Sequence, residues 1–339
     1  MTAPLLSVRG LSVAFRARSG AGAPWTRTRA LQAVRDVSFD LASAETLGIV
    51  GESGSGKSTL ARALIGTVPV AQGRALWRGK DLLAMAPKDR RPLRRDIQMV
   101  FQDPLGALDP RMTAGQIIAE SLTTHETRLP RDRVRARVME TMERVGLLPG
   151  QINRYPHEFS GGQCQRIGIA RALIVRPRLV ICDEPVSALD VSVQAQIVNL
   201  LQDLKRDLDL SMIFISHDLS VVKHISDRIM VLYLGRVLEH APARDLVRAP
   251  RHPYTRALVA SAPVPDPAVE RGRPAVALVG EPPSPLAPPS GCVFRTRCPI
   301  ARRSCASEAP AMRDYGDGHA AACPYGEPAG EEGVRRLKP

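Results

Sequence analysis

The sequence predicts an α/β fold in which short buried strands end in residues suited to binding phosphate and metal. Three mainly apolar segments support this prediction: residues 46–50, 179–182 and 211–216. A glycine-rich loop follows the first segment, two adjacent carboxylates follow the second and a histidine follows the third. Ligands gather at the carboxyl ends of strands in open parallel sheets. We therefore expect these strand ends to contribute to one nucleotide site.

The composition indicates a globular chain with a polyanionic neighbour. The 339 residues are 44% hydrophobic, and the length suggests two domains or one large domain with an appendage. No apolar run approaches the ~18–20 residues that span a bilayer, and residues 1–13 lack the pattern of a signal peptide, so a cytoplasmic location is expected.

The net charge of +13 permits nucleic acid, a nucleotide or an anionic membrane as the partner. Aromatic residues make up only 4%, which counts against a single-strand-binding surface. The basic run 88–95 is expected to be solvated surface.

The segment after the first strand has the spacing of a phosphate loop, G-x-x-x-x-G-K-[ST], and a helix is expected from residue 58 to 65. Its glycines allow backbone N–H groups to curl around phosphate oxygens, and the helix N-terminus adds its positive end. Lys57 is expected to reach the β- and γ-phosphates, while the Ser58 hydroxyl can bind Mg²⁺. The residues assigned to the nucleotide are Gly51, Glu52, Ser53, Gly54, Ser55, Gly56, Lys57, Ser58 and Thr59.

The second strand ends in an acidic pair that can serve metal and water. Asp183 is expected to hold Mg²⁺ through its water shell, and Glu184 is placed to polarise the attacking water as general base. Cys182, just before them, is expected to pack as a small hydrophobic residue. One carboxylate for the metal and one for the water is the minimum for hydrolysis, so the pair predicts that the bound nucleotide is hydrolysed.

Three further features belong to the predicted site. His217 follows the third strand and is expected to contact the γ-phosphate, and Gln102 follows another apolar segment, DIQMVF. The sequence SGGQ, residues 160–163, opens a helical segment and so forms a second anion-binding helix N-terminus. Because the chain has its own phosphate loop, a second such site makes sense if it serves a nucleotide held by a partner chain.

In this order and spacing, the phosphate loop, Gln102, SGGQ, the acidic pair, SALD and His217 resemble an ATP-binding cassette (ABC) ATPase. The resemblance implies a RecA-like phosphate-loop core with antiparallel β and helical subdomains. Residues 1–250 would form this nucleotide-binding domain, with the helical subdomain at about 106–177.

The resemblance also implies a head-to-tail dimer that encloses two ATP molecules. The signature residues that would close over the partner's γ-phosphate are Ser160, Gly161, Gly162 and Gln163. Asp190 would couple the two sites, Gln102 would sense Mg²⁺ and water while touching a membrane subunit, and the adenine would stack on Phe15, with Trp25 as the alternative. The catalytic assignments are Lys57, Gln102, Glu184 and His217, and the Mg²⁺ assignments are Ser58, Gln102 and Asp183.

Residues 251–339 are expected to form a C-terminal extension. The chain resembles the ATPase subunits of oligopeptide and dipeptide importers in its segment HPYTRAL, its nine prolines between Pro263 and Pro289 and its cysteine-containing tail. The oligopeptide permease is the branch that it resembles most in the segments FQDPLGALDPRMTAGQIIAESL, FSGGQCQRIGIARALI and PPSGCVFRTRCPIA. So much proline precludes a regular helix and favours a semi-rigid connection or one ordered by docking.

Four of the six cysteines lie in this tail with the spacing C-x5-C-x6-C-x17-C: Cys292, Cys298, Cys305 and Cys323. Four thiolates can hold Zn²⁺ or a [4Fe–4S] cluster, although neither has this spacing as a fingerprint. The resemblance favours the iron–sulfur cluster, with zinc, free thiols and occasional disulfides as alternatives. A structural role is expected, and His319 is predicted to be a surface histidine rather than a ligand.

The resemblance implies a definite set of partners and a location. Two membrane-spanning permease subunits would form the pore, a sister ATPase would complete the dimer, and an extracytoplasmic protein would deliver peptides. The chain would then lie at the cytoplasmic face of the inner membrane and use ATP and Mg²⁺. The transported solute and the choice between homodimer and heterodimer stay open.

The competing hypothesis is a soluble ABC ATPase that acts on nucleic acid or the ribosome, which the net charge of +13 permits. Such proteins usually carry two cassettes, a long coiled coil or zinc-finger insertions. This sequence has one phosphate loop and no sustained heptad pattern, so no nucleic-acid partner is expected.

Overall fold

The computed structural model describes residues 3–18, 28–262 and 280–326, and their strands form two sheets. The smaller sheet is antiparallel, with four strands in the order β2-β1-β4-β5. These strands are β1 (Leu6–Arg18), β2 (Thr28–Leu41), β4 (Gln72–Trp77) and β5 (Lys80–Asp81). The predicted antiparallel β part is therefore confirmed.

The larger sheet carries the predicted strands at its centre. It has eight strands in the order β11-β12-β10-β9-β3-β8-β7-β6, and the five from β9 to β6 run parallel. Its strands are β3 (Thr46–Val50), β6 (Ile97–Val100), β7 (Leu179–Asp183), β8 (Ser211–Ser216), β9 (Arg228–Tyr233), β10 (Arg236–Pro242), β11 (Arg313–Asp314) and β12 (Ala320–Ala321). Every residue of β3, β7 and β8 is buried, as expected for parallel strands covered on both faces.

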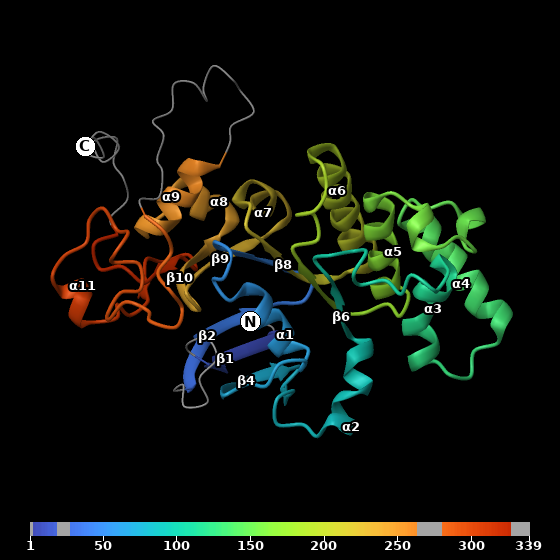
Figure 1. Ribbon diagram of the computed structural model, residues 1–339, viewed down its shortest axis with the longest axis horizontal. Coiled ribbons are helices and arrows are strands. Elements are labelled where there is room, and N and C mark those ends of the chain that lie inside the picture. Colours follow the sequence, from blue (N-terminus) through green and yellow to red (C-terminus); the bar gives the residue numbers. More distant parts are fainter. Residues whose placement is uncertain (1–2, 19–27, 263–279, 327–339) are drawn as a thin grey trace, which may run out of the picture.

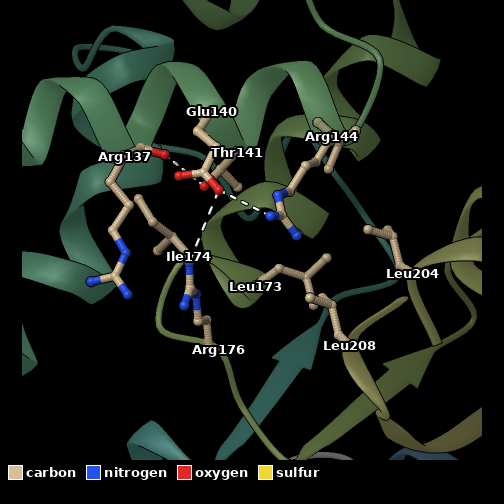
Figure 2. A pocket seen from close by; sticks show the side chains of 10 residues that line it. Arg137, Glu140, Thr141, Arg144, Leu173, Ile174, Arg176, Leu204 and Leu208 are labelled. Atoms are coloured by element: carbon tan, nitrogen blue, oxygen red, sulfur yellow. Dashed lines mark hydrogen bonds and ion pairs between the residues drawn. The ribbon is translucent and has the colours of Figure 1, made fainter. Parts of the chain in front are cut away.

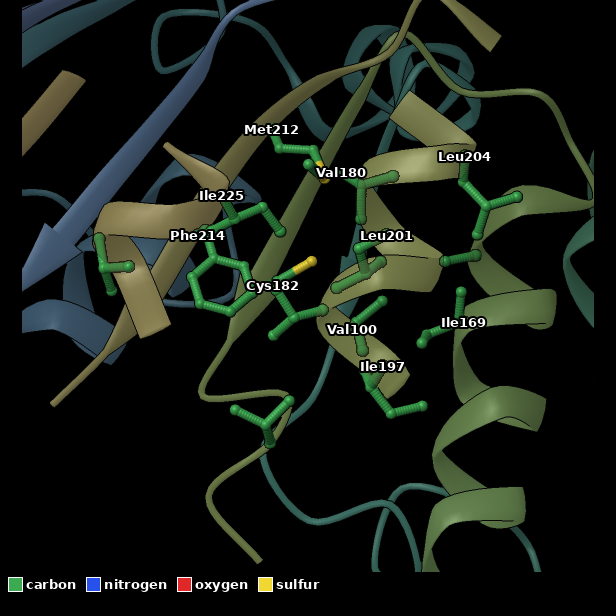
Figure 3. Close-up of a cluster of buried hydrophobic side chains, with 14 of the residues drawn as sticks. Val100, Ile169, Val180, Cys182, Ile197, Leu201, Leu204, Met212, Phe214 and Ile225 are labelled. Atoms are coloured by element: carbon green, nitrogen blue, oxygen red, sulfur yellow. The ribbon is translucent and has the colours of Figure 1, made fainter. Parts of the chain in front are cut away.

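One face of this sheet packs against helices α5 (Gly161–Leu173), α6 (Val191–Leu208) and α7 (Leu219–Ile225) (Figure 3). The cluster labelled in Figure 3 comprises Val100, Ile169, Val180, Cys182, Ile197, Leu201, Leu204, Met212, Phe214 and Ile225. Cys182 is fully buried, and burial raises the pKa of its thiol to about 12. It packs as a small hydrophobic residue, as predicted.

Helices α3 (Ala114–His125), α4 (Arg131–Arg144) and α5 lie at one end of the molecule. The C-terminal segment, of which residues 251–262 and 280–326 are described, lies toward the other end (Figure 1). Both α3 and α5 begin with a capping box, in which the Thr113 or Ser160 side chain accepts a bond from the backbone three residues later. The described region also contains α1 (Lys57–Leu64), α2 (Pro87–Arg90), α8 (Ala243–Arg248), α9 (Pro253–Ser261), α11 (Ser304–Ser307) and the 3₁₀ turns η1 (Pro92–Arg95), η2 (Pro149–Gln151) and η3 (Pro156–Glu158). None of the helices in the described segments is long and apolar enough to cross a bilayer.

The C-terminal segment joins the core sheet, because β12 pairs with β10 at that sheet's edge. Glu239 of β10 is fully buried and accepts backbone N–H bonds from Arg251, at 2.7 Å, and His252, at 2.8 Å. The Nε2 atom of His319 lies 2.7 Å from Oε1 of the same carboxylate. His319 is 7% exposed, so its prediction as a surface histidine is wrong. The buried carboxylate needs hydrogen-bond partners, and the tail histidine supplies one.

Candidate nucleotide-hydrolysing site

The phosphate loop lies between β3 and α1, where the sequence predicted it. Gly56 has a φ of 102°, and a Cβ there would lie 2.2 Å from the carbonyl oxygen of Ala33. A Cβ on Gly51 would lie 2.1 Å from the carbonyl oxygen of Leu232. No side chain caps α1. The loop therefore requires glycine at both positions and presents the N-terminal N–H groups of α1 to an anion.

Lys57 is buried within this loop. Its ammonium donates to the carbonyl oxygen of Gly51 at 2.7 Å and to that of Glu52 at 3.0 Å, and it lies 3.7 Å from Oε1 of Glu184. Burial lowers the pKa of Lys57, and the carboxylates of Glu184 and Asp183 oppose this effect. A desolvated ammonium that faces carboxylates rather than water is ready to bind a phosphate oxygen.

Ser58 and Asp183 meet beneath the loop. The Ser58 hydroxyl donates to Oδ1 of Asp183 at 2.7 Å, although the two residues are 125 positions apart. Burial raises the pKa of Asp183, whereas the bond from Ser58 lowers it. A hydroxyl and a buried carboxylate side by side are oxygen ligands of the kind that Mg²⁺ uses with nucleotide phosphates.

Glu184 lies at the centre of the polar residues that follow the strands. Its Oε2 accepts from Nε2 of Gln102 at 3.0 Å and lies 3.3 Å from Nδ1 of His217. The backbone of Glu184 has a φ of 47°, a left-handed conformation that is uncommon for a residue with a side chain. The fold thus places Lys57, Gln102 and His217 around the carboxylate of Glu184, although the four residues come from four separate segments of the chain.

The SGGQ signature lies at a different helix N-terminus. Ser160 is the N-cap of α5, and its hydroxyl accepts from the backbone N–H of Gln163. Ser160 and Gly161 are exposed to solvent. Within the described segments, no hydrogen bond or ion pair joins residues 160–163 to the phosphate loop. This exposed N-terminus can receive an anion from outside the chain.

Asp190 lies beside the signature at the start of α6. Its carboxylate accepts from the Val193 N–H at 3.0 Å and from the Ser192 hydroxyl at 2.7 Å, and these bonds lower its pKa. A Cβ on Gly162 would lie 2.6 Å from Val193, so the signature and the α6 N-terminus are in direct contact. The signature therefore needs glycine at this position for packing as well as for backbone access.

The remaining nucleotide assignments lie in the loop, in the first turn of α1 or on β1. Ser55 is buried, Glu52 and Thr59 are half-buried, and Ser53 and Gly54 are exposed. Phe15, on β1, is half-buried against the β-sheet core. The rival base-stacking residue, Trp25, lies outside the described residues.

The four tail cysteines line one cavity of about 260 Å³ together with His252. They come from sequence positions up to thirty-one residues apart, and none of the chain's six cysteines forms a disulfide. Among the described residues, no group of three or more His, Cys, Asp or Glu side chains has an arrangement that could hold a metal ion. The predicted iron–sulfur cluster is therefore not supported by the positions of these side chains.

A groove of about 840 Å³ opens next to Gln102. It extends from the end of β6 to α3 and α5, and its lining includes Phe101, Glu120 and Arg171. Phe101 is 39% exposed, which is unusual for an aromatic side chain with so large an apolar surface. The groove thus extends from Gln102 to the helical part of the molecule.

A cavity of about 20 Å³ lies where α4 meets α5 and α6 (Figure 2). Glu140 is 3.0 Å from Arg144 and 4.0 Å from Arg176 in this region, so its charge is already paired. The cavity is too small for a nucleotide and lies away from the phosphate loop. It marks packing between the helical part and the core rather than a second ligand site.

The phosphate loop, the acidic strand end and the separate signature helix together define a nucleotide-binding subunit of the ABC type. The family model described as "ABC transporter" matches residues 34–187, and that for the C-terminal region of oligopeptide/dipeptide transporters matches residues 238–305. The chain belongs to the family of oligopeptide transport ATP-binding proteins, as its relatives show.

Two of these relatives are named oligopeptide transport ATP-binding protein OppF. The Escherichia coli protein is 58% identical over 91% of this chain and 92% of its own length, and the Haemophilus influenzae protein is 53% identical over 94% and 96%. These matches confirm the predicted resemblance to the ATPase subunits of peptide importers.

Solved structures share the same fold. A Clostridium perfringens protein, cbiO1, part of the ABC transporter complex cbiONQ, has a TM-score of 0.62 and 27% identity, with 73% of this chain and 92% of that chain covered. A dimeric structure of MJ0796, a bacterial ABC transporter cassette, has a TM-score of 0.62 and 25% identity, with coverage of 70% and 99%. The predicted ABC ATPase fold is confirmed by these neighbours.

Proposed function

We propose that this chain is the ATP-hydrolysing subunit of a membrane importer for peptides. The observation that carries the proposal is the convergence of Lys57, Gln102, Glu184 and His217 at the phosphate loop of a chain 58% identical to an oligopeptide transport ATP-binding protein. The matching C-terminal region, residues 238–305, supports the assignment to peptide transport.

The contacts around Glu184 support a division of roles in hydrolysis. Glu184 acts as general base on the attacking water, and Gln102 and His217, which contact its carboxylate, orient that water and the γ-phosphate. Lys57 stabilises charge on the phosphate oxygens, and Ser58 and Asp183 would hold Mg²⁺, which would supply further positive charge to the phosphates. The Lys57 ammonium, the Ser58 hydroxyl and the Gln102 amide each already make a hydrogen bond within the site.

The exposed signature supports a dimer in which each chain completes its partner's ATP site. Ser160 and Gly161 present an open helix N-terminus to solvent, a suitable donor group for a γ-phosphate held by another chain. Asp190 is the N-cap of α6 and accepts a bond from the Val193 N–H, so it would connect this interface to the backbone of α6. Closure on ATP and reopening after hydrolysis would then drive the permease.

The groove beside Gln102 supports a contact with the membrane subunits. Its volume of about 840 Å³ and its exposed Phe101 suit a short helix that carries apolar and polar residues. Two membrane-spanning subunits, a sister ATPase and an extracytoplasmic peptide-binding protein would complete the importer. The chain would then lie at the cytoplasmic face of the membrane.

Deletion of the gene tests the substrate class. We expect cells without it to lose uptake of labelled oligopeptides, since transport stops when the ATP-driven step is absent. Restoring the wild-type gene should recover uptake, and a copy with Glu184→Gln should not. Unchanged uptake of peptides of every length, from dipeptides upward, would contradict the proposed peptide import.

We further propose that the four tail cysteines hold an iron–sulfur cluster as a structural staple. Its basis is the cavity that all four cysteines line, which gathers thiols from distant tail positions, while the side chains of the described residues form no group arranged to hold a metal ion. Burial and neighbouring thiols raise the pKa of Cys292, Cys298 and Cys323. Thiols in such a setting stay protonated unless a cation compensates their charge. A bound cluster would supply that charge and connect distant parts of a tail with little core of its own.

Metal analysis tests this part of the proposal. Anaerobically purified protein should contain about four iron and four acid-labile sulfide per chain, and a variant with all four tail cysteines replaced by serine should contain neither. Cys164→Ser, at a buried cysteine outside the tail, is the matched control and should keep both. Zinc instead of iron would keep the staple but change its chemistry, whereas neither metal would contradict it.

A further inference from the structure

Glu52, the second residue of the phosphate loop, is bonded to the C-terminal segment from two directions. Its backbone N–H donates to the Tyr254 hydroxyl at 2.9 Å, across 202 positions of sequence. Its carboxylate Oε2 accepts from Nη1 of Arg297 at 2.7 Å, across 245 positions. One residue of the loop is therefore held by both the HPY segment and the cysteine tail.

These two contacts are well shielded from water. The Arg297 side chain is 6% exposed and that of Glu52 is 23% exposed, while Tyr254 is fully buried. An ion pair in such surroundings is screened little by salt, and loss of one partner leaves a buried charge uncompensated. Arg297 and Glu52 thus depend on each other, unlike the partners of an exposed surface pair.

A block of aromatic side chains fixes the positions of Arg297 and Tyr254. The rings of Tyr233, Tyr254 and Phe294 lie 4.8 to 5.4 Å apart, and Arg297 also donates to the Tyr233 hydroxyl at 3.4 Å. Tyr233 ends β9, the strand that pairs with β3 immediately before the phosphate loop. The block therefore connects the tail to the same part of the core sheet from which the loop emerges.

The position of Glu52 in turn affects the groups that meet a phosphate. Its carbonyl oxygen accepts from the Lys57 ammonium at 3.0 Å and from the Ser55 N–H at 3.1 Å. Both donors belong to the curled part of the loop. Any rotation of the Glu52 peptide units would displace the ammonium and the backbone N–H groups together.

We propose that Arg297 and Tyr254 are positioning residues for ATP binding, and that the C-terminal segment is therefore required for full ATP affinity. Neither residue needs to touch the nucleotide, because both act through Glu52 on the shape of the loop. The inference rests on the proposed function only in assuming that this loop binds MgATP. It adds that ATP affinity depends on residues more than 200 positions away from Glu52 in the sequence.

The test compares ATP binding by the full-length protein and its variants. Arg297→Gln should raise the Kd for a fluorescent ATP analogue, with Mg²⁺ present, about tenfold, because the binding-competent loop becomes a minor state and the apparent affinity falls with its population. KM for ATP should rise similarly, while kcat at saturating ATP should stay within about twofold. Arg297→Lys, which keeps a charge, should recover part of the affinity.

Arg295→Gln is the matched control in the same tail. Arg295 donates to the carbonyl oxygen and to the hydroxyl of Ser290, both within the tail, so its loss should disturb the tail without touching the loop. It should leave the Kd for ATP within about twofold of the wild type. Tyr254→Phe removes one hydroxyl from a buried ring and offers a second variant that is expected to fold, with a smaller loss of affinity, about threefold.

A double-mutant cycle separates positioning from general loss of stability. If Arg297 acts through Glu52, Arg297→Gln combined with Glu52→Gln should weaken ATP binding no more than the worse single variant, since both remove the same pair. A lowered melting temperature with unchanged Kd and KM in the Arg297 and Tyr254 variants would overturn the proposal. Failure of the wild-type protein to bind ATP would instead overturn the proposed function, so the two failures are distinguishable.

Discussion

Glu184→Gln is expected to leave ATP binding within about twofold of the wild type and to lower turnover about a thousandfold, the usual scale for loss of a general base. The amide keeps the size of the side chain and can still contact Gln102 and His217. It cannot take a proton from water, so the hydrolytic step fails while the phosphate loop remains intact. The bound ATP should then accumulate in a closed dimer.

The measurements are steady-state phosphate release, equilibrium ATP binding and size-exclusion chromatography with MgATP. Glu140→Gln is the matched control, because Glu140 is a paired carboxylate on α4 that lies away from the loop. It should hydrolyse ATP at the wild-type rate. Hydrolysis at a wild-type rate in Glu184→Gln would show that another group activates the water.

Lys57→Gln is expected to weaken ATP binding about a hundredfold, the scale of a lost hydrogen bond between charged groups in a shielded site. Lys57 is 4% exposed and is the cation that faces Glu184 across 3.7 Å. The positive charge of Lys57 offsets the negative charges of Glu184 and Asp183. Without Lys57, these carboxylates would repel the approaching phosphates. Turnover should fall with occupancy at every accessible ATP concentration.

Isothermal titration and the shift of melting temperature by MgATP measure this loss, because a ligand stabilises the folded state more when it binds more tightly. Lys205→Gln is the control, since Lys205 pairs with Asp227 outside the site. It should bind ATP normally. A wild-type thermal shift by MgATP in Lys57→Gln would show that this lysine does not bind the phosphates.

The core of the fold and the residues of the site could be predicted because their signals are local. The segments that form β3, β7 and β8 are mainly apolar, which is the pattern of parallel strands buried on both faces. The phosphate loop is a contiguous set of residues with fixed spacing, and its strand and helix follow one another directly in the chain. Placement of Asp183, Glu184 and His217 at strand ends then follows from the direction of parallel strands.

The C-terminal segment was harder to interpret because its contacts are not local. The pairing of β12 with β10 involves only two residues of each strand, too few for a periodic signal. His319 resembled a surface residue until its neighbour proved to be the fully buried Glu239, 80 positions earlier. The segment HPY indicates a family, but no local pattern in it predicts that Tyr254 contacts Glu52.

The sequence by itself determined the chemistry of this protein: a phosphate loop, an acidic strand end, a signature helix and the order in which they occur. Spacing and apolar periodicity suffice for these features because each depends on residues close together in the chain. Only the tertiary structure decided that the tail reaches the phosphate loop through Arg297 and that four cysteines share one cavity. Such contacts depend on how segments 245 positions apart pack together, and no local pattern encodes that arrangement.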